Sequence, residues 1–298
     1  MAVAVSTSAE QTRARYPDES GYVEREGIRS FYEVYGSGER TVVLLPTWSL
    51  FHSRIWKMQI PYLARHHRVV TFDGRGNGRS DRPRDPAAYD EREFAGDALA
   101  VMDVTEAEHA VVVGFSLGGQ RGLILAGEHP ERVDGAVFIG PRFAGGGEPV
   151  PERTLYDFDT QYETAEGWAK HNRFHWLRDY RDWVEFFVST IFTEPHSTKP
   201  IEDAVGWGLE TDADVMIATM DAPDQSPAEM QALCRRVRCP VLVIHGEHDA
   251  INSVTRGAAM AEQTGGELVV LAGSGHAPHI RDPVKVNLLI REFLESLR

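Results

Sequence analysis

The sequence predicts an α/β fold with a mostly parallel central sheet, helices on its flanks and an inserted helical cap. Two observations support this prediction. Short apolar runs alternate with helix-like stretches along most of the chain, as in parallel sheets that are covered on both faces. The alternation stops between about residues 142 and 230, where aromatic, helical sequence takes over. We therefore expect a core formed by residues 1–141 and 231–298, and a cap formed by residues 142–230.

The predicted sheet begins with two short strands, 21–25 and 30–35, joined by a turn at Glu26-Gly27. The run 41–45 is almost wholly apolar and predicts the next strand. Further strands are predicted at 67–72, 110–113, 135–139, 240–245 and 267–271. Between them, helices are predicted at 55–65, 91–104, 117–129, 254–264 and 283–297.

Within the predicted cap, aromatic residues recur at helical spacing. Trp176, Tyr180, Trp183 and Phe187 follow one another at steps of four, three and four, which places them on one face of a helix. Such a stripe packs the cap against the core, lines part of a substrate pocket, or does both. Trp176 and Trp183 are therefore candidate substrate-binding residues.

Composition excludes some classes of function. The chain has 298 residues, of which 42% are hydrophobic, so a sizeable core is available. The formal net charge of −14 argues against a nucleic-acid partner. Cys234 and Cys239 have no recognised metal or redox spacing.

The N-terminal segment 1–20 contains only the short apolar stretch 2–5, without a basic leader before it. No stretch of the chain approaches the length of a membrane span. We therefore expect a soluble cytoplasmic protein that does not bind membranes. The sequence does not indicate an oligomeric state.

The most informative segment is 111–119, Val-Val-Val-Gly-Phe-Ser-Leu-Gly-Gly. A strand that turns sharply into a helix forces its central residue into a strained conformation, so Gly114 and Gly118 are needed where side chains would collide. The turn exposes the hydroxyl of Ser116 beside the N–H groups of the next helix. A serine that merely caps the helix is the simpler alternative.

Two further residues complete a constellation with Ser116. Asp249 follows the predicted strand 240–245, and His276 lies on a glycine-rich loop after the strand 267–271. Catalytic groups collect at the carboxyl ends of parallel strands. A serine needs a base to take its proton, and the base needs a group that fixes its tautomer. His248 and His279 are competing histidines, but the Gly275-His276 pair favours His276.

These motifs resemble those of the α/β-hydrolase fold superfamily, specifically capped serine hydrolases similar to esterases and lactonases. The resemblance runs from about Tyr22 to the C-terminus and includes the loop 73–80, Asp-Gly-Arg-Gly-Asn-Gly-Arg-Ser. It implies a catalytic triad of Ser116, Asp249 and His276. It also implies a mostly structural loop 73–80 that fixes the backbone near the site.

The sequence departs from this family after the third strand. Members usually have His-Gly there, whereas this chain has Pro46-Thr47-Trp48. Aligning the motif implies that the N–H groups of Trp48 and Leu117 form the oxyanion hole. Alternatively, the Trp48 indole is a pocket wall that contacts substrate. Phe115, beside the nucleophile, is a further candidate for substrate binding.

The predicted function is hydrolysis of a small carboxylic ester or lactone through an acyl-enzyme intermediate. A serine at the elbow, rather than an aspartate, argues against dehalogenase and epoxide hydrolase chemistry. The alternatives are a carbon–carbon bond hydrolase or acyltransferase with the same triad, and a ligand-binding receptor that retains the fold. We expect no organic cofactor and no metal.

One segment of the cap has two other interpretations. His171 and His175 are four residues apart, a spacing that can bind metal, but no third ligand is evident. The same segment forms a basic patch with Arg178 and Arg181. The patch either attracts an anionic substrate or is a salt-bridged helix surface.

Overall fold

The computed structural model describes residues 13–297 and contains a single eight-stranded sheet among them. The strands lie in the order β1-β2-β4-β3-β5-β6-β7-β8. Their bounds are Glu19–Arg25, Ile28–Tyr35, Thr41–Leu44, Arg68–Phe72, Ala110–Phe115, Val133–Ile139, Val241–Gly246 and Glu267–Leu271, in chain order. β2 pairs antiparallel with β1 and β4, and all other pairs are parallel. The predicted fold class is confirmed. The apolar stretch 2–5 lies outside the described residues.

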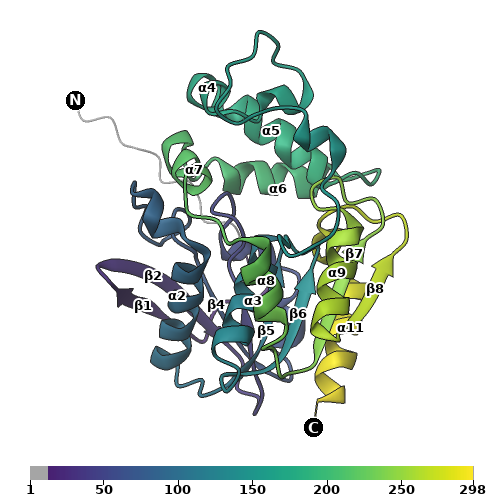
Figure 1. The fold of residues 1–298 in the computed structure, drawn as a ribbon. Coiled ribbons are helices and arrows are strands. Elements are labelled where there is room, and N and C mark those ends of the chain that lie inside the picture. Colours follow the sequence, from purple (N-terminus) through teal and green to yellow (C-terminus); the bar gives the residue numbers. More distant parts are fainter. Residues whose placement is uncertain (1–12, 298) are drawn as a thin grey trace, which may run out of the picture.

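Helices cover both faces of the sheet, because the central strands are apolar on both sides. In β5, Val111 and Val113 belong to one hydrophobic cluster and Val112 to the other, as the twofold period of a strand requires. Figure 1 shows α2 (Glu91–Val104), α3 (Leu117–Glu128), α8 (Pro227–Cys234) and α9 (Val254–Thr264) side by side on one face. The helices α1 (Ile60–Leu63) and α11 (Pro283–Ser296) contribute buried residues to the cluster on the other face.

One predicted helix is wrong in its extent. The segment 55–65 forms a 3₁₀ turn, η1 (Ser53–Trp56), followed by the single-turn helix α1. Pro61 lies in the first turn of α1, where its missing N–H costs nothing. The same residue prevents one continuous helix, because a helix that began earlier would need that N–H.

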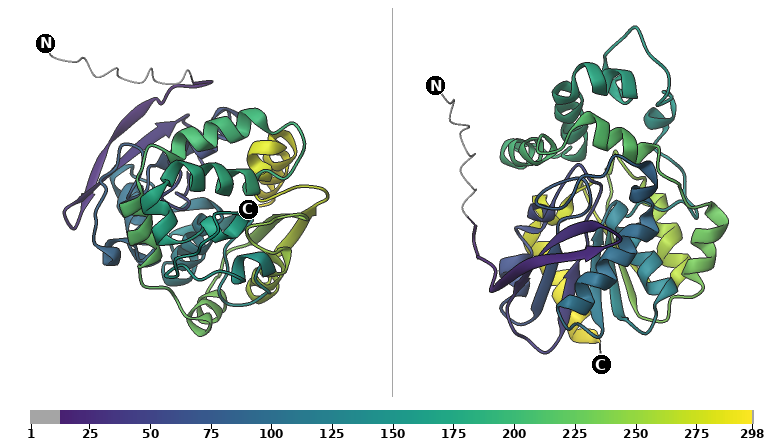
Figure 2. Two further views of the ribbon diagram at one scale, coloured as in Figure 1. Left: turned by 90° about the horizontal axis from the view of Figure 1, so that it is seen from above. Right: turned by 90° about the vertical axis from the view of Figure 1, so that its left-hand side faces the viewer.

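Between β6 and β7, a helical layer lies above the carboxyl ends of the strands (Figures 1 and 2). It contains α4 (Arg173–Arg178), α5 (Tyr180–Ile191), α6 (Thr198–Gly208) and α7 (Ala213–Met220). Two short 3₁₀ turns, η3 (Pro151–Thr154) and η4 (Gly167–Lys170), precede them. The expected boundary at residue 230 falls inside α8, which packs against α3 in the core rather than in this layer.

The aromatic stripe of the cap is divided between two helices. Asp179 has a non-helical backbone and its side chain accepts the Asp182 N–H, so it ends α4 and caps α5. Trp176 and Trp183 meet across this break with their ring centroids 4.0 Å apart. The expectation of one continuous helical face is therefore wrong.

Candidate active site

Ser116 stands on a strained turn between β5 and α3. Its φ of 54° and ψ of −117° lie outside the regions that most side chains adopt. A Cβ on Gly114 would lie 2.1 Å from the Gly118 carbonyl oxygen, and one on Gly118 would lie 2.8 Å from the Pro46 carbonyl oxygen. The structure thus shows the collisions that the sequence predicts at both glycines. The Ser116 N–H donates to the Ile139 carbonyl at 2.9 Å, which anchors the turn to β6.

Asp249 and His276 lie beside each other at the ends of β7 and β8. The His276 Nδ1 is 2.8 Å from the Asp249 Oδ2. The other carboxylate oxygen, Oδ1, accepts the backbone N–H groups of Ile251 and Asn252, each at 2.8 Å. The Asp249 carboxylate accepts a hydrogen bond from the Nδ1–H of His276. In the neutral His276 ring, Nε2 therefore has no proton and is the hydrogen-bond acceptor. That nitrogen is the one a general base would use.

A second histidine, His245, contacts the same carboxylate and was not predicted from the sequence. Its Nε2 lies 3.1 Å from the Asp249 Oδ2 and 2.9 Å from the Asn252 carbonyl oxygen. Burial raises the pKa of Asp249, but the charge and hydrogen bonds of His276 and the hydrogen bond of His245 outweigh burial and hold that pKa below its usual value. Asp249 is therefore an anion between two histidines. The position of His245 on β7, four residues before Asp249, is the only sequence signal for it.

His276 lies next to the elbow, although no hydrogen bond joins it to the Ser116 hydroxyl among residues 13–297. The ring of Phe115, the neighbour of Ser116, is 4.7 Å from the His276 ring. A Cβ on Gly140 would lie 3.2 Å from the His276 Nδ1 and 3.3 Å from the Asp249 Oδ2, so β6 approaches the same pair closely. Catalytic hydrogen bonds are often long without substrate and tighten when it binds.

The N–H groups of Trp48 and Leu117 have no acceptor within the described part of the chain. Both residues, with Ser116, line one cavity.

The loop that contains Trp48 is held by Arg121 of α3, whose guanidinium donates to the Pro46 and Thr47 carbonyls. Glu91 pairs with this buried guanidinium at 2.6 Å. Sequence reasoning did not identify Arg121, because nothing local shows that its side chain reaches the loop after β3.

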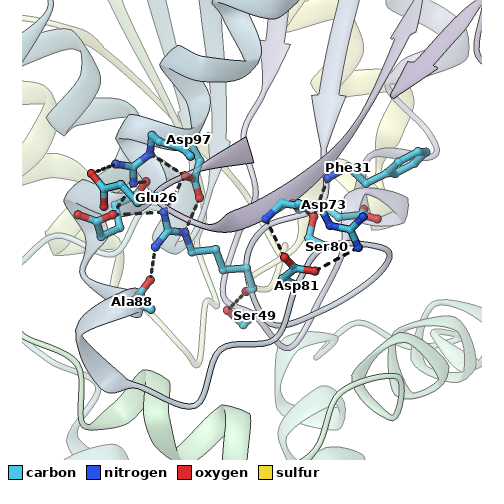
Figure 3. Close-up of polar contacts among 12 residues, drawn as sticks. Glu26, Phe31, Ser49, Asp73, Ser80, Asp81, Ala88 and Asp97 are labelled. Atoms are coloured by element: carbon cyan, nitrogen blue, oxygen red, sulfur yellow. Dashed lines mark hydrogen bonds and ion pairs between the residues drawn. The ribbon is translucent and has the colours of Figure 1, made fainter. Parts of the chain in front are cut away.

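Hydrogen bonds also join the loop 73–80 to Ser49, Ala88 and Asp97, which Figure 3 labels. The Arg75 guanidinium makes two hydrogen bonds to Asp97, at 2.6 and 2.8 Å, and a third to the Ala88 carbonyl. The Arg75 carbonyl accepts the Ser49 hydroxyl at 2.7 Å. Ser49 follows Trp48, so this network restrains the position of the Trp48 N–H.

The cavity has a volume of about 430 Å³, within the usual size of small-molecule sites. The Trp48 indole also lines it and donates to the Thr219 hydroxyl of α7 at 2.8 Å. Trp48 is thus placed both as a wall and as a source of a backbone donor. Phe158, His171 and Phe187 add the cap side of the cavity.

Three predicted substrate contacts do not line this cavity. Phe115 is buried, with its ring 4.4 Å from that of His279. Trp176 and Trp183 are fully buried and pack behind Trp48, with centroid distances of 6.1 and 5.8 Å. Trp176 and Trp183 were expected to line the pocket, and the structure does not place them there. Both belong to the core of the cap, where they pack against Trp48 and support it.

The competing histidines have other environments. His279 is fully buried and neither ring nitrogen has a hydrogen bond. Burial lowers the pKa of His279 to about 3. His248 is exposed and lies 3.9 Å from Glu247. Within the described residues, neither imidazole makes a hydrogen bond or ion pair with the Asp249 carboxylate.

His171 and His175 do not face a common ligand. The His175 Nε2 is 2.8 Å from Asp182, whereas the His171 Nδ1 accepts the Trp183 indole N–H at 3.3 Å. Residues 13–297 contain no cluster of three or more His, Cys, Asp or Glu side chains that could hold a metal ion. The salt-bridged interpretation of the basic patch named Asp179 and Asp182 as partners: Asp182 pairs with Lys170 and His175, whereas Arg181 pairs with Glu185. Within the same range, no helix is long and apolar enough to cross a membrane.

Comparisons with known proteins identify the family and the fold. A family model described as alpha/beta hydrolase fold matches residues 40–283. The 2-hydroxymuconate semialdehyde hydrolase of Pseudomonas sp. strain CF600 is 29% identical over 244 residues, which cover 80% of each chain. The esterase RhEst1 from Rhodococcus sp. ECU1013 has a similar structure, with a TM-score of 0.77 at 24% identity over 94% of this chain and 99% of that chain. Est816, described as an N-acyl homoserine lactone degrading enzyme, gives a TM-score of 0.73 at 25% identity over 92% and 100% of the two chains.

Proposed function

Because this chain belongs to the α/β-hydrolase fold family, we propose that it is a serine hydrolase that cleaves a small ester or lactone. The observation that supports this proposal best is the position of Ser116. It stands on a strained turn in the wall of a cavity that Trp48 and Leu117 also line, and the backbone N–H groups of these two residues have no acceptor among residues 13–297. The His276–Asp249 pair lies at the same edge of the sheet.

In the proposed mechanism, the His276 Nε2 removes the proton from the Ser116 hydroxyl as its oxygen attacks the substrate carbonyl. Asp249 fixes the His276 tautomer and stabilises the imidazolium. The N–H groups of Trp48 and Leu117 donate to the oxyanion. His276 then protonates the leaving alcohol and activates the water that releases the acid from Ser116.

The size of the cavity and its aromatic wall support an ester or lactone of small to medium size. The similarity to Est816, described as a lactone-degrading enzyme, favours the same class. A second candidate is carbon–carbon bond cleavage, because the 29% identical relative is named 2-hydroxymuconate semialdehyde hydrolase. Both reactions would use the same three residues, so the substrate distinguishes them.

Fluorophosphonate labelling with a panel of short esters and lactones tests the proposal. We expect an adduct at Ser116 and turnover of at least one ester or lactone. Ser116→Ala and His276→Ala should each lower kcat by roughly 10⁴-fold or more while the variants stay folded, since members of a triad act as a unit. His248→Ala is the matched control, because this exposed histidine should leave kcat unchanged.

Two results would contradict the proposal. Absence of an adduct at Ser116 would exclude the nucleophile. An adduct without turnover of any ester or lactone would favour the carbon–carbon hydrolase or a ligand-binding receptor, and a vinylogous 1,5-diketone substrate then separates these two.

A further inference from the structure

Three arginines from separate elements line the cavity that contains Ser116. Arg142 follows β6, Arg153 lies in η3 and Arg256 lies in α9. The protein has a formal net charge of −14. Three cationic side chains at one cavity are therefore opposite in sign to the net charge of the protein. The question is which of these arginines has a partner within the protein.

Arg142 is neutralised by the protein itself. Its guanidinium forms a double hydrogen bond with Asp224, at 3.0 and 2.5 Å. This bond holds the pKa of Asp224 below its usual value, although burial acts in the opposite direction. Arg142 and Asp224 together therefore add no net charge to the cavity.

Arg153 and Arg256 have no carboxylate partner among residues 13–297. The Arg153 Nη1 donates to the Ile251 carbonyl at 2.6 Å, and its guanidinium lies 5.0 Å from the Trp168 ring centroid. These contacts orient the Arg153 guanidinium but do not neutralise its positive charge. The Arg256 Nε is buried and has no hydrogen bond. A buried donor without an acceptor costs free energy, and since Arg256 lines the cavity as a partly exposed residue, an anion there can pair with its guanidinium charge.

Electrostatics support the same conclusion. Burial lowers the pKa of Arg153 to about 10, the neighbouring charges of Arg142 and Arg256 contribute to that lowering, and the charge of Asp249 opposes it without outweighing it. Arg153 still has a full charge at neutral pH. Two cations held near each other in a partly buried site repel, and an anion between them would turn this repulsion into attraction.

The cap supplies a neutral donor to the same cavity. The indole of Trp183 donates to the His171 Nδ1, so the ring proton of neutral His171 is on Nε2. Burial, and then the charge of Arg153, lower the pKa of His171 to about 3. The Nε2–H of His171 has no acceptor in the described part of the chain.

We propose that the substrate has a carboxylate at the end remote from its reacting carbonyl, and that Arg153 and Arg256 bind this carboxylate while the carbonyl reaches Ser116. This inference rests on the proposed function and specifies its substrate class. Guanidinium groups suit a carboxylate because their planar donors match its two oxygens. A neutral ester of the same length would provide neither cation with a carboxylate partner.

Two esters that differ only at the remote end test this proposal. Mono-4-nitrophenyl glutarate has a carboxylate where 4-nitrophenyl pentanoate has a methyl group, and both release the same leaving group. We expect the wild type to prefer the glutarate in kcat/KM by about 10- to 100-fold, the size of charge-assisted hydrogen bonding to one group. The preference should decrease as salt is added, to the extent that the site is open to solvent.

Arg256→Gln should lower this preference by about tenfold or more, because it removes the charge and keeps a polar side chain. Arg153→Lys should lower it less, since one charge remains but the planar donor pair is lost. The ratio of the two substrates is the readout, because general damage to Ser116 chemistry lowers both rates and leaves their ratio unchanged. Arg181→Gln is the matched control: it removes one charge from the surface of the cap, away from the cavity, and should leave the ratio at the wild-type value.

The outcomes separate this inference from the proposed function. Turnover of pentanoate with no preference for glutarate, or a preference that survives both Arg153→Lys and Arg256→Gln, would overturn the carboxylate site alone. Failure of both esters together with no fluorophosphonate adduct at Ser116 would overturn the proposed function as well. Glutarate binding to Ser116→Ala, measured by calorimetry and weakened by Arg256→Gln, would support the carboxylate site without any turnover.

Discussion

The two sides of the cavity are built in different ways. On the sheet side, Ser116, Asp249 and His276 each follow the end of a strand, and backbone hydrogen bonds hold Ser116 and His276 while two backbone N–H groups bind the Asp249 carboxylate. On the cap side, Phe158 and Phe187 reach the cavity from elements whose positions depend on helix packing. We propose that the sheet side supplies the reacting groups, whereas the cap side, together with Arg256 of α9, selects the molecule that reacts.

The two sides are nevertheless connected. At the end of α5, the Ile191 carbonyl accepts the His276 N–H at 3.2 Å, and the Glu194 carboxylate accepts the Gly275 N–H at 2.8 Å. The histidine loop is thus partly held by the cap. A cap substitution that lowers kcat, or a sheet-side substitution that changes substrate preference, would show that the two sides do not act independently.

Outside the proposed triad, the largest effect is expected from Arg121→Lys on the sheet side. Lysine cannot bridge the Pro46 and Thr47 carbonyls and Glu91 at once, so the Trp48 N–H should lose its fixed position. We expect kcat to fall by roughly 10- to 100-fold, less than the loss of a whole oxyanion donor, with KM little changed.

Arg132→Lys is the control for this variant. Arg132 also donates to two carbonyls, those of Ala107 and Glu108, but does not line the cavity. Equal losses of kcat in the two variants would show that general destabilisation, rather than the loop after β3, explains the result for Arg121.

A smaller effect is expected from Glu194→Ala, which removes the contact between the cap and the histidine loop. The loss of one hydrogen bond should lower kcat by roughly 3- to 10-fold. Glu194→Gln keeps an acceptor for the Gly275 N–H and should retain most of kcat. Glu185→Ala, on the exposed surface of α5, the helix that ends before Glu194, should have no effect. A change confined to KM would mean that the cap does not position His276.

The smallest effect concerns stability rather than rate. His279 is buried beneath Phe115 with a pKa near 3, below the ordinary value of 6.5. Between these values the unfolded chain binds a proton that the folded chain does not, so acid lowers the free energy of unfolding. We expect His279 to lower the free energy of unfolding by about 1–2 kcal/mol when the pH falls from 7 to 5.

His279→Leu should remove that part of the pH dependence and raise the free energy of unfolding at pH 7 by about 1 kcal/mol, since two nitrogens without partners are eliminated. Urea denaturation at both pH values measures the difference. Equal pH dependence in the variant and the wild type would show that His279 is not the titrating group.

Much of the sheet side was predictable because its signals are local. The strands predicted at 30–35, 67–72 and 267–271 match the observed ones within about two residues, since apolar runs bounded by turn residues specify buried strands. Gly114 and Gly118 were also predictable, because a tight turn from strand to helix leaves no room for a side chain at these positions. The helix predicted at 55–65 failed because its periodicity does not reveal that Pro61 starts a new turn.

The cap side was much less predictable. Four aromatic residues at helical spacing indicated a helix face, but the Asp179 cap divided it. Trp183 and Phe187 are both buried, yet only Phe187 lines the cavity. Spacing alone does not show which side of a helix meets a cavity.

By itself, the sequence determined the fold class and placed a serine, an aspartate and a histidine after three strands, because strand periodicity and turn chemistry act over a few residues. Only the tertiary structure brought Arg153 and Arg256 to one cavity and left both without a carboxylate partner. These two side chains are distant in the chain, and their meeting depends on how the cap packs over the sheet. Burial and charge pairing are properties of that packing, so they are absent from any local pattern.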